Sequence, residues 1–178
     1  QIIFSGEIFT NYLQPIDGLL SVIDGVLPTG SSSFYKDSHG ILPVLGSIAN
    51  VNRILPVHML ESSIISLIAK VITIISTAKI GTIIASIHLE DPDGSKSEIT
   101  VEQGMIYRLP VQSGQIVKIK IEPKGRIEID SSLLSKPFAI QSGVCGILID
   151  ARGRPILFPK EEVKRKDLVK KWLQNLMI

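Results

Sequence analysis

The sequence predicts a mixed fold: an α/β region, then an all-β domain, then a C-terminal amphipathic helix. Three observations predict it. Apolar residues recur at helical spacing before residue 61, alternate with a period of two from residue 64, and return to helical spacing after residue 160. With 178 residues and 44% apolar content, the chain can bury a sizeable core. We therefore expect an α/β region over 1–61, an antiparallel β domain over 62–159 and a docked helix over 160–178.

The first region begins with a strand, a turn and a helical pattern. Gln1 to Phe4 is typical of a buried strand, and Ser5, Gly6 and Glu7 form a small-residue turn that leads into a helical pattern. Pro15 then fits the first turn of a helix whose apolar positions recur at helical spacing until Pro28-Thr29-Gly30 ends it. Three further elements are expected before residue 62: a short strand over 32–36, a buried helix over 40–50 and a short helix over 56–61.

The second region consists of many short strands separated by turns. Residues 115–122 show the clearest alternation, with apolar side chains on one face and Gln, Lys and Glu on the other. So many strands in so few residues favour an antiparallel β-sandwich or a small barrel. The expected strands are 64–76, 80–89, 97–101, 105–109, 116–122, 126–130, 138–141, 144–150 and 155–158.

The last nineteen residues predict an amphipathic helix. Trp172 is the large residue of its apolar stripe, and lysines occupy most other faces. A basic amphipathic helix also binds membrane surfaces or acidic partners, but docking on the body with a solvated lysine face is the simpler explanation. The predicted stripe consists of Val163, Val169, Trp172, Leu173 and Leu176.

Composition argues against several classes of partner and cofactor. The net charge is only +2, which predicts no nucleic-acid partner. Lys70 and Lys79 interrupt the apolar stretch over 64–89, so two strands fit better than a membrane span. The single cysteine, Cys145, fits a core residue and a reducing cytoplasm, and the three histidines lack ligand spacing, so no metal site is expected.

Two sets of residues are candidate binding groups. Ser5, Gly6 and Glu7 lie where a strand delivers a turn to a helix N-terminus, a common place for a nucleotide or another anion, although a simple corner between two core elements is the plainer explanation. Arg152 and Arg154 lie in the segment 150–155, which resembles an exposed hairpin tip able to hold a phosphate or an acidic partner. The alternative is that both arginines are solvated or pair with nearby carboxylates.

No catalytic residue is predicted. The sequence has no Gly-x-Ser-x-Gly elbow, no Gly-x-x-x-x-Gly-Lys phosphate loop and no Gly-x-Gly-x-x-Gly fingerprint after a strand. The serines cluster in turn-like runs without a positioned histidine and acid, which argues against an independent hydrolase.

Four blocks together resemble a known family. They span residues 2–9 with 19–30, residues 40–49, residues 116–123 and residues 143–155. Their order resembles the C-terminal part of the glutamate mutase accessory protein family called MutL, which is unrelated to the mismatch-repair protein of that name. The Gly-Ile-Leu-Ile-Asp-Ala-Arg-Gly-Arg-Pro block before a Trp-bearing helix is its most specific part. Glu7 stands where the family pattern has a second glycine.

The resemblance implies a relation to the actin, sugar kinase and Hsp70 class of two-lobed ATPases. Ser5, Gly6 and Glu7 would then form the adenosine-side turn of the second lobe, and the Asp-x-Gly phosphate motif would lie upstream of residue 1. The chain would be a C-terminal fragment that is not catalytic by itself and holds no cofactor of its own, whereas the longer protein would use ATP and magnesium. The implied role is a chaperone or accessory function for an adenosylcobalamin-dependent mutase.

A second hypothesis comes from a different class. Many short strands without an acid–base site are typical of a non-enzymatic interaction module. In that case the tip with Arg152 and Arg154, or a strand edge, would dock another protein.

Overall fold

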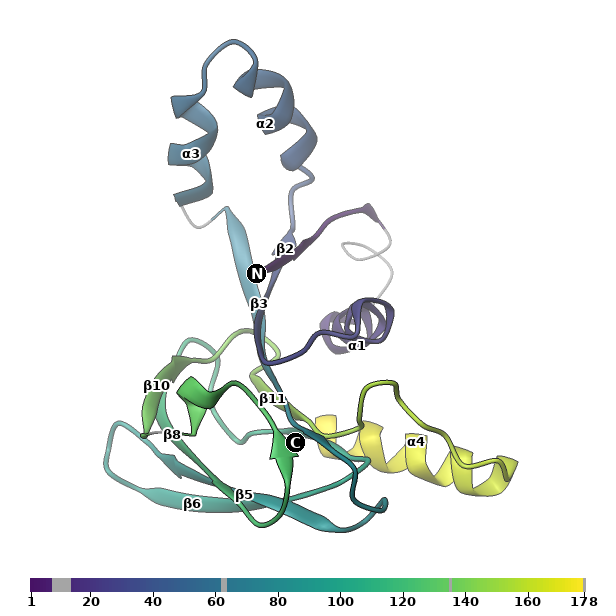
Figure 1. Ribbon diagram of the computed structural model, residues 1–178. Coiled ribbons are helices and arrows are strands. Elements are labelled where there is room, and N and C mark those ends of the chain that lie inside the picture. The colour runs from purple at the N-terminus through teal and green to yellow at the C-terminus, as the bar shows by residue number, and fades with distance from the viewer. Residues whose placement is uncertain (8–13, 62–63, 135, 178) are drawn as a thin grey trace.

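A computed structural model describes residues 1–7, 14–61, 64–134 and 136–177, and these form a mixed α/β structure dominated by β-sheet. Figure 1 shows a lower body built from strands, with α4 along one side, and an arm in which β2 and β3 rise to the hairpin of α2 and α3. The helices are α1 (Pro15–Val26), α2 (Leu42–Ala49), α3 (Ile54–Glu61) and α4 (Glu162–Leu176). The strands are β1 (Ile2–Phe4), β2 (Ser31–Asp37), β3 (Ile65–Thr73), β4 (Ile75–Ser76), β5 (Ile83–Glu90), β6 (Lys96–Glu102), β7 (Ile106–Arg108), β8 (Ile116–Pro123), β9 (Ile127–Glu128), β10 (Phe138–Gln141) and β11 (Ile147–Asp150).

The larger sheet has five strands in the order β1-β2-β3-β11-β7. It is mixed, because β1 pairs with β2 and β3 pairs with β11 in parallel, whereas β2–β3 and β11–β7 are antiparallel. Two of its strands come from the region expected to end at residue 61 and three from the region after it. One sheet therefore runs across that expected boundary.

The second sheet is antiparallel, with four strands in the order β10-β8-β5-β6. A two-stranded ribbon of β4 and β9 completes the β structure of the described residues. None of these sheets closes on itself, so the predicted barrel is wrong, and the prediction of a purely antiparallel region is wrong because β3 and β11 run parallel.

Alternating side chains divide the core into two layers. Ile72 and Ile74 around the end of β3, with Ile147 and Ile149 of β11, face a cluster that contains the inner side chains of β5 and β8. Val71 of β3 and Leu148 of β11 belong to the other cluster, together with side chains of α1 and α4. The central strands β3 and β11 are thus buried on both faces where they cross the body, which explains why they are nearly continuously apolar.

The predicted helices at the two ends of the sequence are confirmed. α1 begins at Pro15, whose missing N–H costs nothing in a first helical turn, and buries Leu19 and Ile23. α4 buries Trp172, whose indole N–H donates a hydrogen bond of 2.8 Å to the carbonyl of Gly104. The predicted apolar stripe of α4 is partly wrong: Leu168 is buried, whereas Val163 is exposed.

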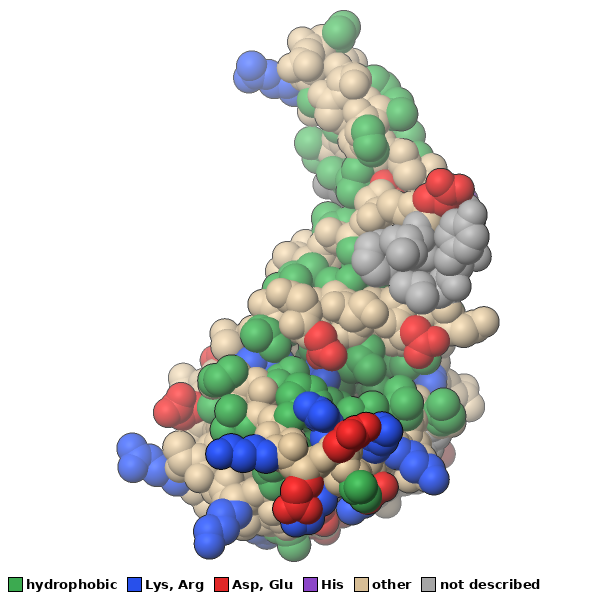
Figure 2. Space-filling view, turned by 90° about the vertical axis from the view of Figure 1, so that its right-hand side faces the viewer, with side chains coloured by type: hydrophobic (Ala, Val, Ile, Leu, Met, Phe, Trp, Pro, Cys, Tyr) green, Lys and Arg blue, Asp and Glu red, His purple; other side chains and the backbone are tan. Residues whose placement is uncertain are grey.

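The helix predicted over 40–50 forms as α2, but the prediction that it is buried is wrong. Leu45 is the buried residue of α2, and α2 packs against α3 in a hairpin that extends from the body. Figure 2 shows hydrophobic side chains exposed along this arm, while charged side chains gather on the lower body. The exposed apolar residues of the hairpin are Val44, Val51, Ile54, Leu55, Val57 and Leu60.

The predicted strand over 155–158 does not form. After β11 the chain turns through residues 152–156 and then runs without regular structure to residue 161. Pro155 lacks an N–H to donate to a strand partner. The predicted hairpin tip is therefore a turn and loop that lead into α4.

Three further predictions concern the single cysteine, the segment after Glu7 and membrane-spanning helices. Cys145 is buried, and burial raises the pKa of its thiol, as expected for a core residue. Most of the helical pattern predicted directly after Glu7 lies in residues 8–13, outside the described part of the chain. Among the described helices, none has the length and apolar content needed to cross a membrane.

Candidate functional site

The turn after β1 lies beside the end of β2. The two strands run parallel, with Phe4 opposite Lys36, so their carboxyl ends meet at one edge of the sheet. The hydroxyl of Ser5 donates a hydrogen bond of 3.0 Å to Asp37 Oδ2. Gly6 has a φ of 123°, which L-residues with a side chain rarely adopt. The sequence-predicted residues Ser5 and Gly6 are thus fixed next to the start of α2.

Asp37 organises this edge. Its carboxylate accepts hydrogen bonds from the backbone N–H groups of Ile41 (3.0 Å) and Leu42 (3.1 Å), which lie at the N-terminus of α2. Burial raises the pKa of Asp37, but the bonds from Leu42, Ile41 and Ser5 outweigh it and leave the pKa below its ordinary value. Asp37 is therefore a buried carboxylate that stays ionised at neutral pH.

A cavity of about 440 Å³ opens between the two turns. Ser5, Gly6 and Glu7 line one side, and the loop from β2 to α2 lines the other. Sequence reasoning missed the second side, although parallel strands place their following loops at a common edge. The residues that it missed are Ser38, His39, Gly40 and Pro43.

The chemistry of this cavity favours a nucleoside over a phosphate. Phosphate sites at helix N-termini use free backbone N–H groups and a positive field. Here Asp37 already occupies the N–H groups of Ile41 and Leu42, and its negative charge opposes a second anion. The serine hydroxyls, the Glu7 carboxylate and the His39 ring instead suit ribose hydroxyls and a base. The described residues contain no group of His, Cys, Asp and Glu arranged to hold a metal ion.

The second pair of predicted residues lies in the interior. Arg152 is 2% exposed and Arg154 is only partly exposed, so the prediction of two exposed arginines on a hairpin tip is wrong. Arg152 binds Asp150 through two parallel hydrogen bonds, Nε to Oδ1 (3.0 Å) and Nη2 to Oδ2 (2.9 Å). Arg154 Nη2 also donates to Asp150 Oδ2 at 2.9 Å. The alternative of pairing with a nearby carboxylate is the one that the structure shows.

Arg152 joins three parts of the chain. Its Nη2 lies 2.8 Å from Oδ1 of Asp24 in α1, and its guanidinium carbon lies 5.0 Å from the ring centroid of Trp172 in α4. Arg154 adds a fourth connection, since its Nε donates to the carbonyl of Pro28 at 2.9 Å. The arginines predicted as surface contacts thus hold β11, α1 and α4 together.

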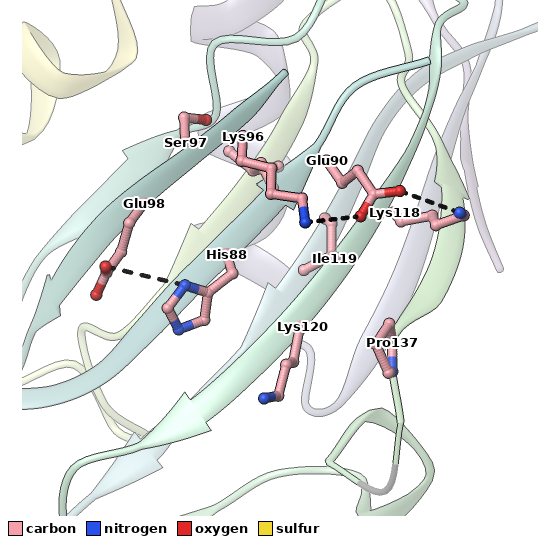
Figure 3. Close-up of a pocket in the computed structure, with 10 residues that line it drawn as sticks. His88, Glu90, Lys96, Ser97, Glu98, Lys118, Ile119, Lys120 and Pro137 are labelled. Carbon is pink, nitrogen blue, oxygen red and sulfur yellow. Dashed lines mark hydrogen bonds and ion pairs between the residues drawn. The ribbon is translucent and has the colours of Figure 1, made fainter. Parts of the chain in front are cut away.

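A different cavity, of about 420 Å³, lies on the open face of the four-stranded sheet. Figure 3 shows its side chains rising from β5, β6 and β8, with His88 beside Glu98 and with Glu90 between Lys96 and Lys118. The contact between His88 Nδ1 and Glu98 and the Lys96–Glu90 ion pair are both long, at 3.9 Å, and every group in them is at least one-third exposed. Such pairs contribute little to stability, which leaves this charged face available for contacts with other molecules.

No protein-family model matches the chain, and comparisons with curated proteins and with solved structures likewise find no match.

Proposed function

We propose that this chain forms the nucleoside-binding side of the second lobe of an actin-like ATPase-type accessory protein, of the kind that the MutL resemblance implies. The observation that carries the proposal is the cavity at the carboxyl ends of β1 and β2, lined by Ser5, Gly6 and Glu7. In open α/β sheets, ligands bind at this edge of parallel strands. The proposal extends to the family role, in which the longer protein hydrolyses ATP to service an adenosylcobalamin-dependent mutase.

The division of labour in a two-lobed ATPase supports this assignment. One lobe holds the phosphates and magnesium, and the other contacts the adenosine. The capped N-terminus of α2 suits the second task, because Asp37 takes up the N–H groups that a phosphate would need. We therefore expect adenosine, ADP and ATP to bind this chain with similar, weak affinity, and we expect no magnesium-dependent hydrolysis by the chain alone.

Replacing Gly6 by alanine tests the site. At a φ of 123° an added Cβ strains the turn and displaces the backbone that faces the cavity. We expect the affinity for a fluorescent adenosine nucleotide, measured by anisotropy, to fall by about tenfold. Gly114→Ala is the matched control, because Gly114 has a φ of 80° in a turn where an added Cβ meets nothing within 4 Å.

Comparing Gly6→Ala with Gly114→Ala shows whether a loss of nucleotide affinity comes from the opening turn or from any strained glycine turn. Equal affinity of Gly6→Ala and Gly114→Ala would contradict the placement of the nucleoside at the opening turn. Magnesium-dependent ATP hydrolysis by the unmodified chain would contradict the proposed role as the adenosine side of a divided site.

A second function, a non-enzymatic protein-interaction module, is favoured by the charged cavity on the four-stranded sheet. Three lysines and two glutamates line it together with His88, over strands whose side chains are half-exposed. An acidic partner segment would complement the lysines. This function is compatible with the first, because the sheet lies in the lower body and the nucleoside cavity lies on the arm.

Reversing the charge of Lys120 tests the second function. Lys120 lines the cavity, so Lys120→Glu should reduce recovery of a bound protein from extract at least several-fold. Lys170→Glu makes the same charge change on the exposed face of α4 and should leave recovery unchanged. Quantitative mass spectrometry of the captured proteins measures both, and equal recovery by the two variants would count against the sheet face.

A further inference from the structure

Two buried polar atoms have no hydrogen-bond partner within the described residues. They are Oε1 of Gln103 and Nη1 of Arg152. Gln103 is 6% exposed and Arg152 is 2% exposed, so both side chains are almost wholly buried. Folded proteins rarely leave a buried donor or acceptor unpaired, because the lost hydration is not recovered. A buried donor and a buried acceptor left unpaired on residues that line one cavity point to a ligand group.

Both residues line the same cavity, which has a volume of about 380 Å³. An ideal Cβ on Gly153 would lie 3.5 Å from Gln103 Nε2, so the amide end of Gln103 sits against this glycine at the cavity wall. Gly153 has a φ of 92°, which residues with a side chain rarely adopt. The cavity wall therefore carries no side chain at this point. Most of the remaining lining is apolar: Ile75, Ala78, Ile80, Pro155 and Leu157.

The charges around the cavity exclude an ionic ligand group. Two guanidinium groups, those of Arg152 and Arg154, face two carboxylates, those of Asp150 and Asp24. A phosphate or carboxylate would add an unbalanced negative charge and place its oxygens against Oε1 of Gln103, and an ammonium group would face Arg152. A neutral group that offers an acceptor beside a donor satisfies both unpaired atoms.

We propose that this cavity binds a neutral amide carried on an apolar body. The amide carbonyl accepts a hydrogen bond from Arg152 Nη1, and its N–H donates to Gln103 Oε1. The apolar body packs against Ile75, Ile80 and Leu157. This site is separate from the nucleoside cavity, shares no lining residue with it, and does not depend on the proposed ATPase role.

Titration of the full chain with benzamide and benzoate tests the proposal. The two probes have the same shape and differ in charge and in the N–H donor. Methyl resonances of Ile75, Ile80 and Leu157 report occupancy. We expect saturable shifts with benzamide at a millimolar Kd, as befits a ligand of this size. Benzoate should bind about tenfold more weakly or not at all.

Gln103→Met is the informative variant, because it keeps the side-chain volume and removes the acceptor without disturbing the Arg152 ion pairs. We expect it to weaken benzamide binding by about tenfold. Gln112→Met makes the same change at an exposed loop position and should bind benzamide like the unmodified chain.

Three results would overturn the proposal. Equal binding of benzamide and benzoate would show that the cavity selects only an aromatic ring. Equal benzamide affinities of Gln103→Met and Gln112→Met would show that Gln103 Oε1 does not accept a hydrogen bond from the ligand. Methyl shifts that do not saturate up to about 50 mM benzamide, well above the millimolar range, would show that the cavity does not bind a neutral amide.

Discussion

Replacing Asp150 by alanine is expected to lower the free energy of unfolding by about 3–5 kcal/mol, because it leaves two guanidinium groups without their shared carboxylate in the interior. Asp150 is completely buried and accepts side-chain hydrogen bonds from both Arg152 and Arg154. Urea unfolding followed by Trp172 fluorescence measures the loss. Trp172 is a suitable reporter, because it lies over the Arg152 guanidinium.

Asp24→Ala is the matched control for this prediction. Asp24 is the half-exposed partner of Arg152, and its removal leaves the paired hydrogen bonds between Arg152 and Asp150 in place. We expect a loss of about 1 kcal/mol or less for this variant. Equal losses for Asp24→Ala and Asp150→Ala would contradict the central role of Asp150.

The ionisation of Asp150 makes the free energy of unfolding depend on pH. Burial raises the pKa of Asp150, but hydrogen bonds and charge from Arg152 and Arg154 outweigh it and hold the pKa below its ordinary value. A carboxyl group whose pKa is lower in the folded than in the unfolded state stabilises the fold when it is ionised. This stabilisation is complete at pH values above the pKa in the unfolded state, about 3.9, and is lost as the pH falls through the pKa in the folded state. The stability difference between the unmodified chain and Asp150→Asn should therefore be constant near neutrality and shrink below about pH 4.

Replacing Gly143 by alanine has the second large expected effect. An ideal Cβ at Gly143 would lie 2.4 Å from the carbonyl oxygen of Ile68 and 2.8 Å from the backbone nitrogen of Ala69. The contacts are with backbone of the central strand β3, which cannot rotate away as a side chain can. The turn that Gly143 begins is also tied to β3, since Cys145 N–H donates to Ile68 O at 2.7 Å.

We expect Gly143→Ala to lower the free energy of unfolding by about 3 kcal/mol, at the upper end of the range for overpacking. Gly125→Ala is the control, because Gly125 has ordinary backbone angles and an added Cβ meets nothing within 4 Å. Chemical denaturation of both variants provides the comparison. A Gly143→Ala protein as stable as Gly125→Ala would show that β3 and the turn are not packed as described.

Local signals in the sequence predicted where helices and strands form better than they predicted which strands pair with each other. Pro15 and Trp172 identified α1 and α4 because first-turn proline and helical spacing act within a few residues. The alternation in residues 115–122 identified β8, but a period of two is the same in any sheet. It does not reveal that β2 joins β3, or that β11 lies parallel to β3.

The candidate sites show the same limit. Ser5 and Gly6 were found because a strand-to-turn signal is local, whereas His39 and Gly40 join them only through the parallel pairing of β1 and β2. Arg152 was expected in solvent although its main carboxylate, Asp150, lies two residues away, because the groups that cover it, Asp24 in α1 and Trp172 in α4, are distant in the sequence. Burial of a charge depends on such distant partners.

We propose that a nucleoside binds at the opening turn. Backbone amide NMR of the full chain during titration with ATP tests it most directly. We expect saturable shifts centred on Ser5, Gly6, His39 and Gly40, reproduced by adenosine and not by inorganic triphosphate. Shifts produced by triphosphate alone, or confined to residues outside this cavity, would contradict it.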